Sequence, residues 1–192
     1  MRKNSVRRMT DETDVQAELN LDGGGMTEID TGIGFLDHML ELAGFHGGFD
    51  LKVKCIGDLD VDTHHTSEDI GIVLGRAFSE ALGDRRGIER YGFVFLPMDE
   101  AMARVAVDFS GRPCLVYSVG FDRNMLGSMA TEDFKEFFRG FVNNSMCTLH
   151  IELLYGENDH HKIEAVFKGF GRALKKAVHV TSDVLQSTKG SL

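Results

Sequence analysis

The pattern HHxxE occurs twice in this sequence, and its spacing limits the folds open to the chain. The first copy is His64-His65-Thr66-Ser67-Glu68 and the second is His160-His161-Lys162-Ile163-Glu164, which starts 96 residues later. The same offset relates Gly75-Arg76-Ala77 to Gly171-Arg172-Ala173. Two matches in one register, each followed by a helical pattern, predict an internal duplication.

Hydrophobic periodicity places both copies in similar surroundings. It predicts helices over 34–42, 67–82, 131–142 and 163–178, strands over 49–56 and 146–155, several strands within 91–119, and a strand over 15–21 that ends in a hairpin turn at 22–25. Each half then runs helix, strand, HHxxE, helix. We expect an α+β fold in which the sheets of both halves share a layer packed against helices. Residues 1–192 would form one domain of two pseudo-symmetric halves, about 1–90 and 91–192.

Composition excludes several classes of function. The net charge is −9, so the chain lacks the basic footprint of a nucleic-acid-binding protein. No apolar run is long enough to predict a membrane span, and the basic N-terminus has no apolar signal segment. The chain has three widely spaced cysteines that form no CxxC motif, Cys55, Cys114 and Cys147. This pattern favours a reducing compartment. We therefore expect a cytoplasmic protein that binds neither nucleic acid nor membrane.

The HHxxE pattern is suited to metal binding when it begins a helix. His64 and Glu68 stand four residues apart, so both lie on one face of the first turn. Successive residues point about 100° apart on a helix, so the two histidines of one pair can serve different ions. Imidazoles with carboxylates, and no cysteine, favour an octahedral ion such as Mn²⁺. A solvated surface cluster is the alternative for one copy, but two copies in register argue against it.

Longer segments around these motifs resemble one protein family. They are Gly34-Phe35-Leu36-Asp37-His38-Met39-Leu40, Asp62-Thr63-His64-His65-Thr66-Ser67-Glu68-Asp69, Asn158-Asp159-His160-His161-Lys162-Ile163-Glu164-Ala165 and Ser187-Thr188-Lys189-Gly190. The chain resembles the imidazoleglycerol-phosphate dehydratases of histidine biosynthesis from about Arg8 to Gly190. The resemblance implies a hydro-lyase built from duplicated βαββα-type units.

The resemblance also implies a metal centre and an assembly. Members of the family form homo-oligomers of 24 subunits with two Mn²⁺ ions in each active site at subunit boundaries. The implied ligands are His38, His64, His65, Glu68, His160, His161 and Glu164, together with Glu136. Glu136 stands where the family often has a histidine, so its role as a ligand is open. His46, His150 and His179 match no ligand position, and we expect them to be structural.

The implied reaction converts imidazoleglycerol phosphate to imidazoleacetol phosphate. The hydrogen that leaves carbon is not activated by a carbonyl group, so the imidazole ring must take up the electrons. Metal ions on the ring nitrogens would stabilise an imidazolate or diazafulvene intermediate. Glu12 and Glu164 are the implied acid/base pair, with the assignment between them open, and Asp99 is the preferred partner of a substrate hydroxyl.

A small phosphate substrate also needs cationic contacts. Arg90, Arg112, Lys168, Ser187 and Lys189 match the positions that bind phosphate in the family. Lys189 lies in a polar tail that has no apolar reason to be ordered. The tail would then close over bound phosphate as a lid.

Three other functions remain open from the residues alone. A metal-binding or storage protein would need the histidine motifs but not the cationic set. A di-metal hydrolase would place a phosphate ester on the metals and release inorganic phosphate. A pure interaction module fits the motifs least well.

Overall fold

The computed structural model describes residues 2–190, and its first half begins with strands. The elements of this half are β1 (Lys3–Met9), β2 (Thr13–Asn20), β3 (Thr27–Asp30), α1 (Gly34–Gly47), β4 (Asp50–Gly57) and α2 (His64–Leu82). The four strands form one sheet in the order β1-β2-β4-β3. The pair β3–β4 is parallel, and the other pairs are antiparallel.

The second half repeats this topology. Its elements are β5 (Tyr91–Met98), β6 (Ala101–Asp108), β7 (Cys114–Ser118), β8 (Met125–Leu126), β9 (Met129–Ala130), α3 (Asp133–Ser145), β10 (Thr148–Tyr155) and α4 (Asp159–Ala177). The sheet order is β5-β6-β10-β7, again with one parallel pair, β7–β10. The short β8–β9 hairpin has no counterpart among the described elements of the first half.

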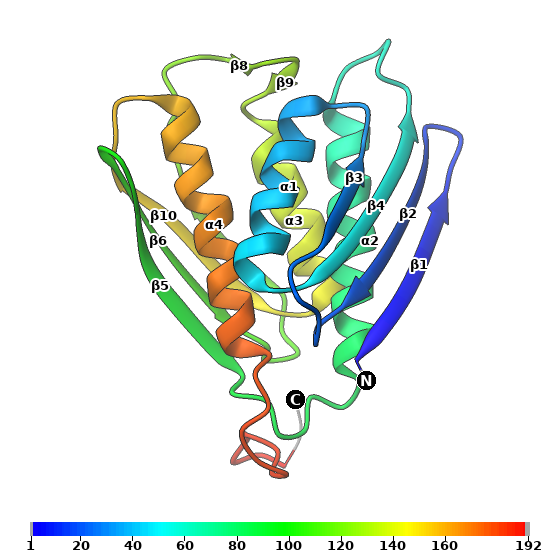
Figure 1. Ribbon diagram of the computed structural model, residues 1–192, viewed down its shortest axis with the longest axis vertical. Helices are drawn as coiled ribbons and strands as arrows, with labels where there is room; N and C mark the ends of the chain where they lie inside the picture. Colours follow the sequence, from blue (N-terminus) through cyan, green and yellow to red (C-terminus); the bar gives the residue numbers. More distant parts are fainter. Residues whose placement is uncertain (1, 191–192) are drawn as a thin grey trace.

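The four helices lie between the two sheets (Figure 1). Helices α1 and α2 pack on the first sheet and α3 and α4 on the second, while α1 contacts α4 and α2 contacts α3 across the middle. In β2 and β6 alternate residues are buried, so one face of each sheet points to the helices. Phenylalanines fill the centre, where Phe138 of α3 lies 5.1 Å from Phe167 of α4 between ring centroids.

The α+β class is confirmed, and three details of the expected fold were wrong. Each unit runs βββαβα, whereas the family resemblance implied βαββα-type units. Periodicity did not detect β1 and β3, because they are charged or short strands. The sheets do not share a layer. Each half has its own sheet, because β1–β4 pair only with one another and β5, β6, β7 and β10 do the same. The helices of the two halves pack closely between the sheets, where glycines allow the contact.

Residues 22–25 do not form a hairpin turn. They carry the chain from β2 past the end of β4 to β3, because Asp50 accepts hydrogen bonds from the backbone N–H groups of Gly24 and Met26. A Cβ atom on Gly23 would overlap Asp50, so the turn requires glycine there. Among the described residues, no helix is long and apolar enough to cross a membrane.

Candidate metal and active site

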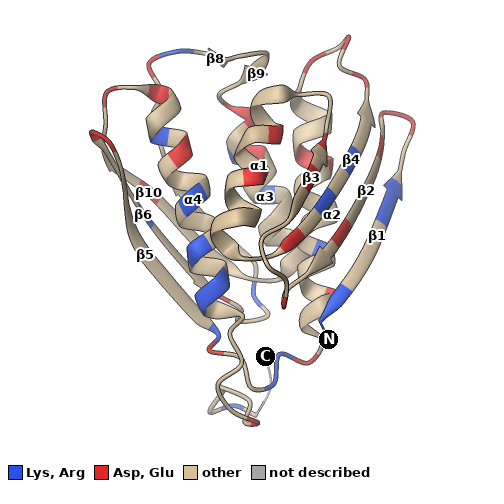
Figure 2. Cartoon of the chain, viewed as in Figure 1, with Lys and Arg blue, Asp and Glu red and all other residues tan. Residues whose placement is uncertain are grey.

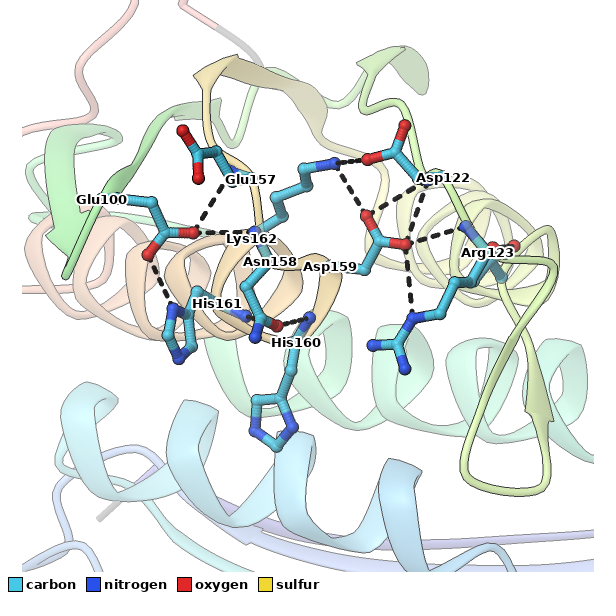
Figure 3. Close-up of polar contacts among 10 residues, drawn as sticks. Glu100, Asp122, Arg123, Glu157, Asn158, Asp159, His160, His161 and Lys162 are labelled. Atoms are coloured by element: carbon cyan, nitrogen blue, oxygen red, sulfur yellow. Dashed lines mark hydrogen bonds and ion pairs between the residues drawn. The ribbon is translucent and has the colours of Figure 1, made fainter.

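Both HHxxE motifs lie in the first turn of a helix, as predicted. Helix α2 begins at His64, whose backbone N–H donates to Asp62 Oδ1 at 2.8 Å. The side chain of Asn158 caps α4 by accepting from the backbone N–H of His160 at 2.9 Å (Figure 3). In both motifs, therefore, a side-chain oxygen two residues before the first histidine accepts a hydrogen bond from its backbone N–H.

One group of predicted ligands comes together between two helices. His38 of α1 and His160 and Glu164 of α4 have ligand atoms that all lie within 4.8 Å of one another. We call these three residues the α1–α4 cluster. Two imidazoles and a carboxylate at this separation fit a divalent transition-metal ion. Within residues 2–190 no second group of three such side chains lies as close together.

Glu164 is the buried member of the α1–α4 cluster, with 8% of its surface exposed. Its Oε1 lies 2.5 Å from Lys168 Nζ, and its Oε2 lies 3.2 Å from His160 Nε2. Burial acts to raise the pKa of the Glu164 carboxyl, but Lys168 and the nearby histidines hold it below its ordinary value. The side chain is therefore ionised at neutral pH and can bind a cation or accept a proton.

The second histidine of each motif is oriented by a carboxylate. His65 Nδ1 lies 2.9 Å from Asp58 Oδ2, and His161 Nδ1 lies 2.7 Å from Glu100 Oε2 (Figure 3). These hydrogen bonds raise the pKa of both histidines. A carboxylate on Nδ1 leaves Nε2 as the free coordinating nitrogen, which is a common arrangement of metal-binding histidines.

Two of the predicted catalytic and substrate-binding carboxylates lie in equivalent turns. Glu12 follows β1, and its Oε1 lies 3.6 Å from His65 Nε2. Asp99 follows β5, and its Oδ2 lies 3.8 Å from His161 Nε2. Glu12 is therefore beside the first motif, whereas Glu164 belongs to the second.

The remaining predicted ligands lie around α2 and α3. His64 Nδ1 is 3.5 Å from Asp133 Oδ1, and Glu136 forms an ion pair with Arg139 on its own helix. Burial raises the pKa of Asp133, which also accepts a hydrogen bond from Thr63 at 2.5 Å. Glu68, four residues after the start of α2, is partly exposed.

Two of the predicted phosphate-binding residues meet at the C-terminal tail. Arg90 and Ser187 line one cavity of about 410 Å³. Arg90 forms a bidentate ion pair with Asp108 and donates to the carbonyl oxygen of Gln186 at 2.6 Å. Lys189 is exposed on the same tail. The tail is irregular, as predicted, and it is held against the start of β5.

Of the other two predicted phosphate-binding residues, Lys168 lies away from the tail, whereas Arg112 is in the turn that begins at Phe109, whose backbone N–H donates to the carbonyl oxygen of Arg90 at 3.1 Å. Lys168 pairs with Glu164, and Arg112 is exposed in the turn between β6 and β7. The helices carry the histidine motifs at one end of the molecule, whereas the tail lies at the opposite end (Figure 1). Helix α4 alone spans about 28 Å. One chain therefore does not bring its tail to its own histidines.

Sequence reasoning missed two carboxylates that contact the motif histidines, Asp58 and Asp133, and considered Glu100 only as an alternative to Asp99 for binding a substrate hydroxyl. Only the position of Asp58, directly after a strand and before the motif, offered a signal. Two histidines that matched no ligand position, His46 and His179, line a cavity of about 620 Å³ with basic residues of α4. Figure 2 shows these basic residues along the lower part of α4.

The fold and the clusters together define a class of protein. It is a duplicated α+β protein with a paired histidine–carboxylate motif in each half, and His160 and Glu164 of the second motif lie close to His38. Sequence comparison gives the family: a profile described as imidazoleglycerol-phosphate dehydratase matches residues 31–174. The chain belongs to the imidazoleglycerol-phosphate dehydratase family, and it is an enzyme of the hydro-lyase class.

Individual members of the family are similar to this chain over nearly its whole length. The imidazoleglycerol-phosphate dehydratase of Clostridioides difficile is 60% identical over 192 residues, which is 100% of both chains. The dehydratase of Chromobacterium violaceum is 51% identical and covers 100% of this chain and 99% of its own length. The crystal structure from Staphylococcus aureus has a TM-score of 0.84 at 41% identity and covers 93% of this chain and 99% of its own. The structure from Pyrococcus furiosus has the same TM-score at 39% identity, with 97% and 100% covered.

Proposed function

We propose that the protein dehydrates imidazoleglycerol phosphate to imidazoleacetol phosphate in histidine biosynthesis, and that it uses two Mn²⁺ ions in each active site. The observation that carries this proposal is the α1–α4 cluster, because it brings together ligands from both the GFLDHML and the HHKIE segments. Those segments are far apart in sequence and are both typical of the family. Three free cysteines support a reducing compartment, which we take to be the cytoplasm.

The donor set fits the metal. The α1–α4 cluster offers two imidazoles and one ionised carboxylate, and His65 and His161 have their Nδ1 atoms held by carboxylates. Such mixed nitrogen and oxygen ligands suit Mn²⁺, Fe²⁺ or Zn²⁺. When bound, the metal supplies Lewis-acid stabilisation of the deprotonated imidazole ring.

Two glutamates of the chain would transfer protons during the reaction. Glu164 is buried beside a lysine that keeps it ionised, which is the form in which a carboxylate accepts a proton. Glu12 is half exposed in a turn and can exchange protons with solvent. The two form the proposed acid/base pair, and Asp99 is the proposed partner of a substrate hydroxyl, which its position beside His161 supports.

The positions of the proposed phosphate-binding residues support an assembly. Arg90, Ser187 and Lys189 lie at the tail end of the chain, away from the histidines, although both sets would have to contact one small substrate. A neighbouring copy can supply the missing half of each site, which requires a closed homo-oligomer. We propose an assembly of about 24 subunits, as in the family.

A direct assay tests the reaction. Purified protein is reconstituted with Mn²⁺ and given imidazoleglycerol phosphate, and the formation of imidazoleacetol phosphate is followed beside a chelated control. We expect turnover that depends on the metal and that is lost in His64→Ala and His160→Ala. Metal-bound protein that forms no product would refute the proposal.

The same assay separates the alternative functions. A di-metal hydrolase would release inorganic phosphate, whereas a dehydratase keeps phosphate on its product. A storage protein would bind metal and leave the substrate unchanged. Measuring phosphate release and product in one sample therefore distinguishes the three functions.

A further inference from the structure

The helix pairs α1–α4 and α2–α3 pack in the same register. A Cβ atom on Gly171 of α4 would overlap the carbonyl oxygen of Ala43 in α1. A Cβ atom on Gly75 of α2 would likewise overlap the carbonyl oxygen of Phe141 in α3. Gly171 follows Gly75 by the repeat offset of 96 residues. The pair α2–α3 is therefore packed like the pair α4–α1.

This register assigns Glu136 an equivalent position on α1. Glu136 stands five residues before Phe141, and His38 stands five residues before Ala43. Because the turn of a helix is fixed, equal separations from equivalent contacts place both side chains on equivalent faces. Glu136 therefore occupies on α3 the position that His38 occupies on α1.

Helices α4 and α2, which pack against α1 and α3, carry their motif residues at equivalent positions. Glu164 and His160 stand seven and eleven residues before the packing glycine of α4, and Glu68 and His64 stand at the same separations in α2. The counterpart of the α1–α4 cluster is thus His64, Glu68 and Glu136, which we call the α2–α3 cluster. The first cluster has two imidazoles and one carboxylate, and the second has one imidazole and two carboxylates.

The residues next to each cluster increase the difference in carboxylate content. In the α1–α4 cluster, Phe35 packs edge-on against His160, with ring centroids 5.2 Å apart. The equivalent position on α3 is Asp133, whose Oδ1 lies 3.5 Å from His64 Nδ1. An aromatic neighbour in one half is therefore replaced by a third carboxylate in the other.

Cationic neighbours differ as well. Lys168 neutralises Glu164 in the α1–α4 cluster, and the equivalent position on α2 is Ile72. In the α2–α3 cluster the ion pair of Arg139 with Glu136 leaves Glu68 and Asp133 as additional negative charges. Each half also has one second motif histidine, His65 or His161. Adding one imidazole to each cluster leaves the α2–α3 cluster richer in carboxylates than the α1–α4 cluster.

We propose that the two clusters are unequal metal sites, and that the α2–α3 cluster selects the harder cation. Carboxylate-rich sites suit Mn²⁺ and Mg²⁺, whereas imidazole-rich sites favour Zn²⁺, Ni²⁺ and Co²⁺ over Mg²⁺. Mg²⁺ therefore competes for the α2–α3 cluster and not for the α1–α4 cluster. This inference rests on the proposed use of divalent metal.

Competition between Mn²⁺ and Mg²⁺ tests the inference. The metal-free protein is loaded with Mn²⁺, Mg²⁺ is added in steps, and released Mn²⁺ is followed by its electron paramagnetic resonance signal. We expect Mg²⁺ to release one of two classes of bound Mn²⁺. In Glu136→His this release should need at least about tenfold more Mg²⁺. The reciprocal His38→Glu should make both classes sensitive to Mg²⁺.

Two controls keep the result interpretable. Glu41→Gln changes an exposed carboxylate on α1 outside the cluster and should leave the wild-type pattern. Glu136→Gln keeps the shape of the side chain without its charge, and it should also reduce Mg²⁺ competition if Glu136→His disturbs α3. Release of both classes together in the wild type, or wild-type competition in both Glu136 variants, would overturn the inference.

The dehydration assay is run separately on the same preparations. Unequal Mn²⁺ classes without product would refute the proposed reaction and leave this inference intact. Product formation with two equal classes would refute this inference and leave the reaction intact.

Discussion

At the scale of single residues, a buried charge network begins helix α4. Lys162 Nζ lies 2.7 Å from Asp159 Oδ1 and 2.8 Å from Asp122 Oδ2, and the backbone N–H groups of Asp122 and Arg123 also donate to Asp159 (Figure 3). Burial acts to raise the pKa of Asp159, but these hydrogen bonds hold it below its ordinary value. The network joins the loop after β7 to the helix that carries the second histidine pair.

Replacing this carboxylate should make stability less dependent on pH. A depressed folded-state pKa stabilises the fold above the unfolded value of about 3.9, and this stabilisation is lost as pH falls through the folded value. We expect Asp159→Asn to lose about 1–3 kcal/mol at pH 7 and the loss to shrink below about pH 4. Urea unfolding at fixed protein concentration and several pH values measures it. Asp122→Asn, on an exposed partner of the same lysine, should cost less, and a pH-independent loss in Asp159→Asn would contradict the prediction.

Lys189 allows a test of the tail at the same scale. We expect Lys189→Ala to raise KM about tenfold or more, because it would remove a charged contact with the substrate phosphate. The value of kcat should change less if the contact is equal in ground and transition states. Steady-state kinetics beside Lys54→Ala, an exposed lysine on β4, measures this. Unchanged KM would exclude the tail from substrate binding.

At the scale of elements, glycine sets the distance between helices. A Cβ atom on Gly75 would overlap the backbone of α3, so Gly75→Ala forces α2 and α3 apart. We expect a loss of about 1–3 kcal/mol of unfolding free energy. Gly34→Ala is the matched control, because a Cβ atom there meets nothing within 4 Å. Equal stability of the two variants in urea unfolding would show that the contact is not tight.

Sequence periodicity predicted the elements that have a strong amphipathic pattern. The four helices and strands β4 and β10 follow from it, because each buries one face against a layer. Strands β1, KNSVRRM, and β3, TEID, carry too few apolar residues for a local signal. They are strands because a neighbouring strand pairs with their backbone, which depends on tertiary structure.

The candidate site likewise has features that local sequence predicts and features that depend on tertiary packing. The HHxxE pattern predicted helix N-termini, which are local structure, and both are confirmed. The grouping of His38 with His160 depends on the register of α1 against α4, which Gly171 sets through a contact distant in sequence. The carboxylate Asp133 comes from α3 and reaches His64 by the same kind of packing. No local pattern encodes such contacts.

At the scale of the whole molecule, metal and assembly should be linked. If ligands come from neighbouring copies, removal of metal removes contacts between subunits as well as the catalytic ion. We expect chelated protein to elute from a sizing column at a smaller mass and to recover its original mass when Mn²⁺ returns. A metal-free protein of unchanged mass would show that other contacts hold the assembly.

Mixed assemblies can test whether each active site spans two chains. The histidine motifs and the tail lie at opposite ends of one chain, so His160→Ala and Lys189→Ala would damage different parts of a shared site. When the variants are co-expressed with different tags and purified through both, some sites receive intact histidines from one chain and an intact tail from the other. We expect these mixtures to exceed the averaged activity of the separate variants at substrate concentrations below KM. If each site lay within one chain, no site would regain both residues, and the mixture would only match that average.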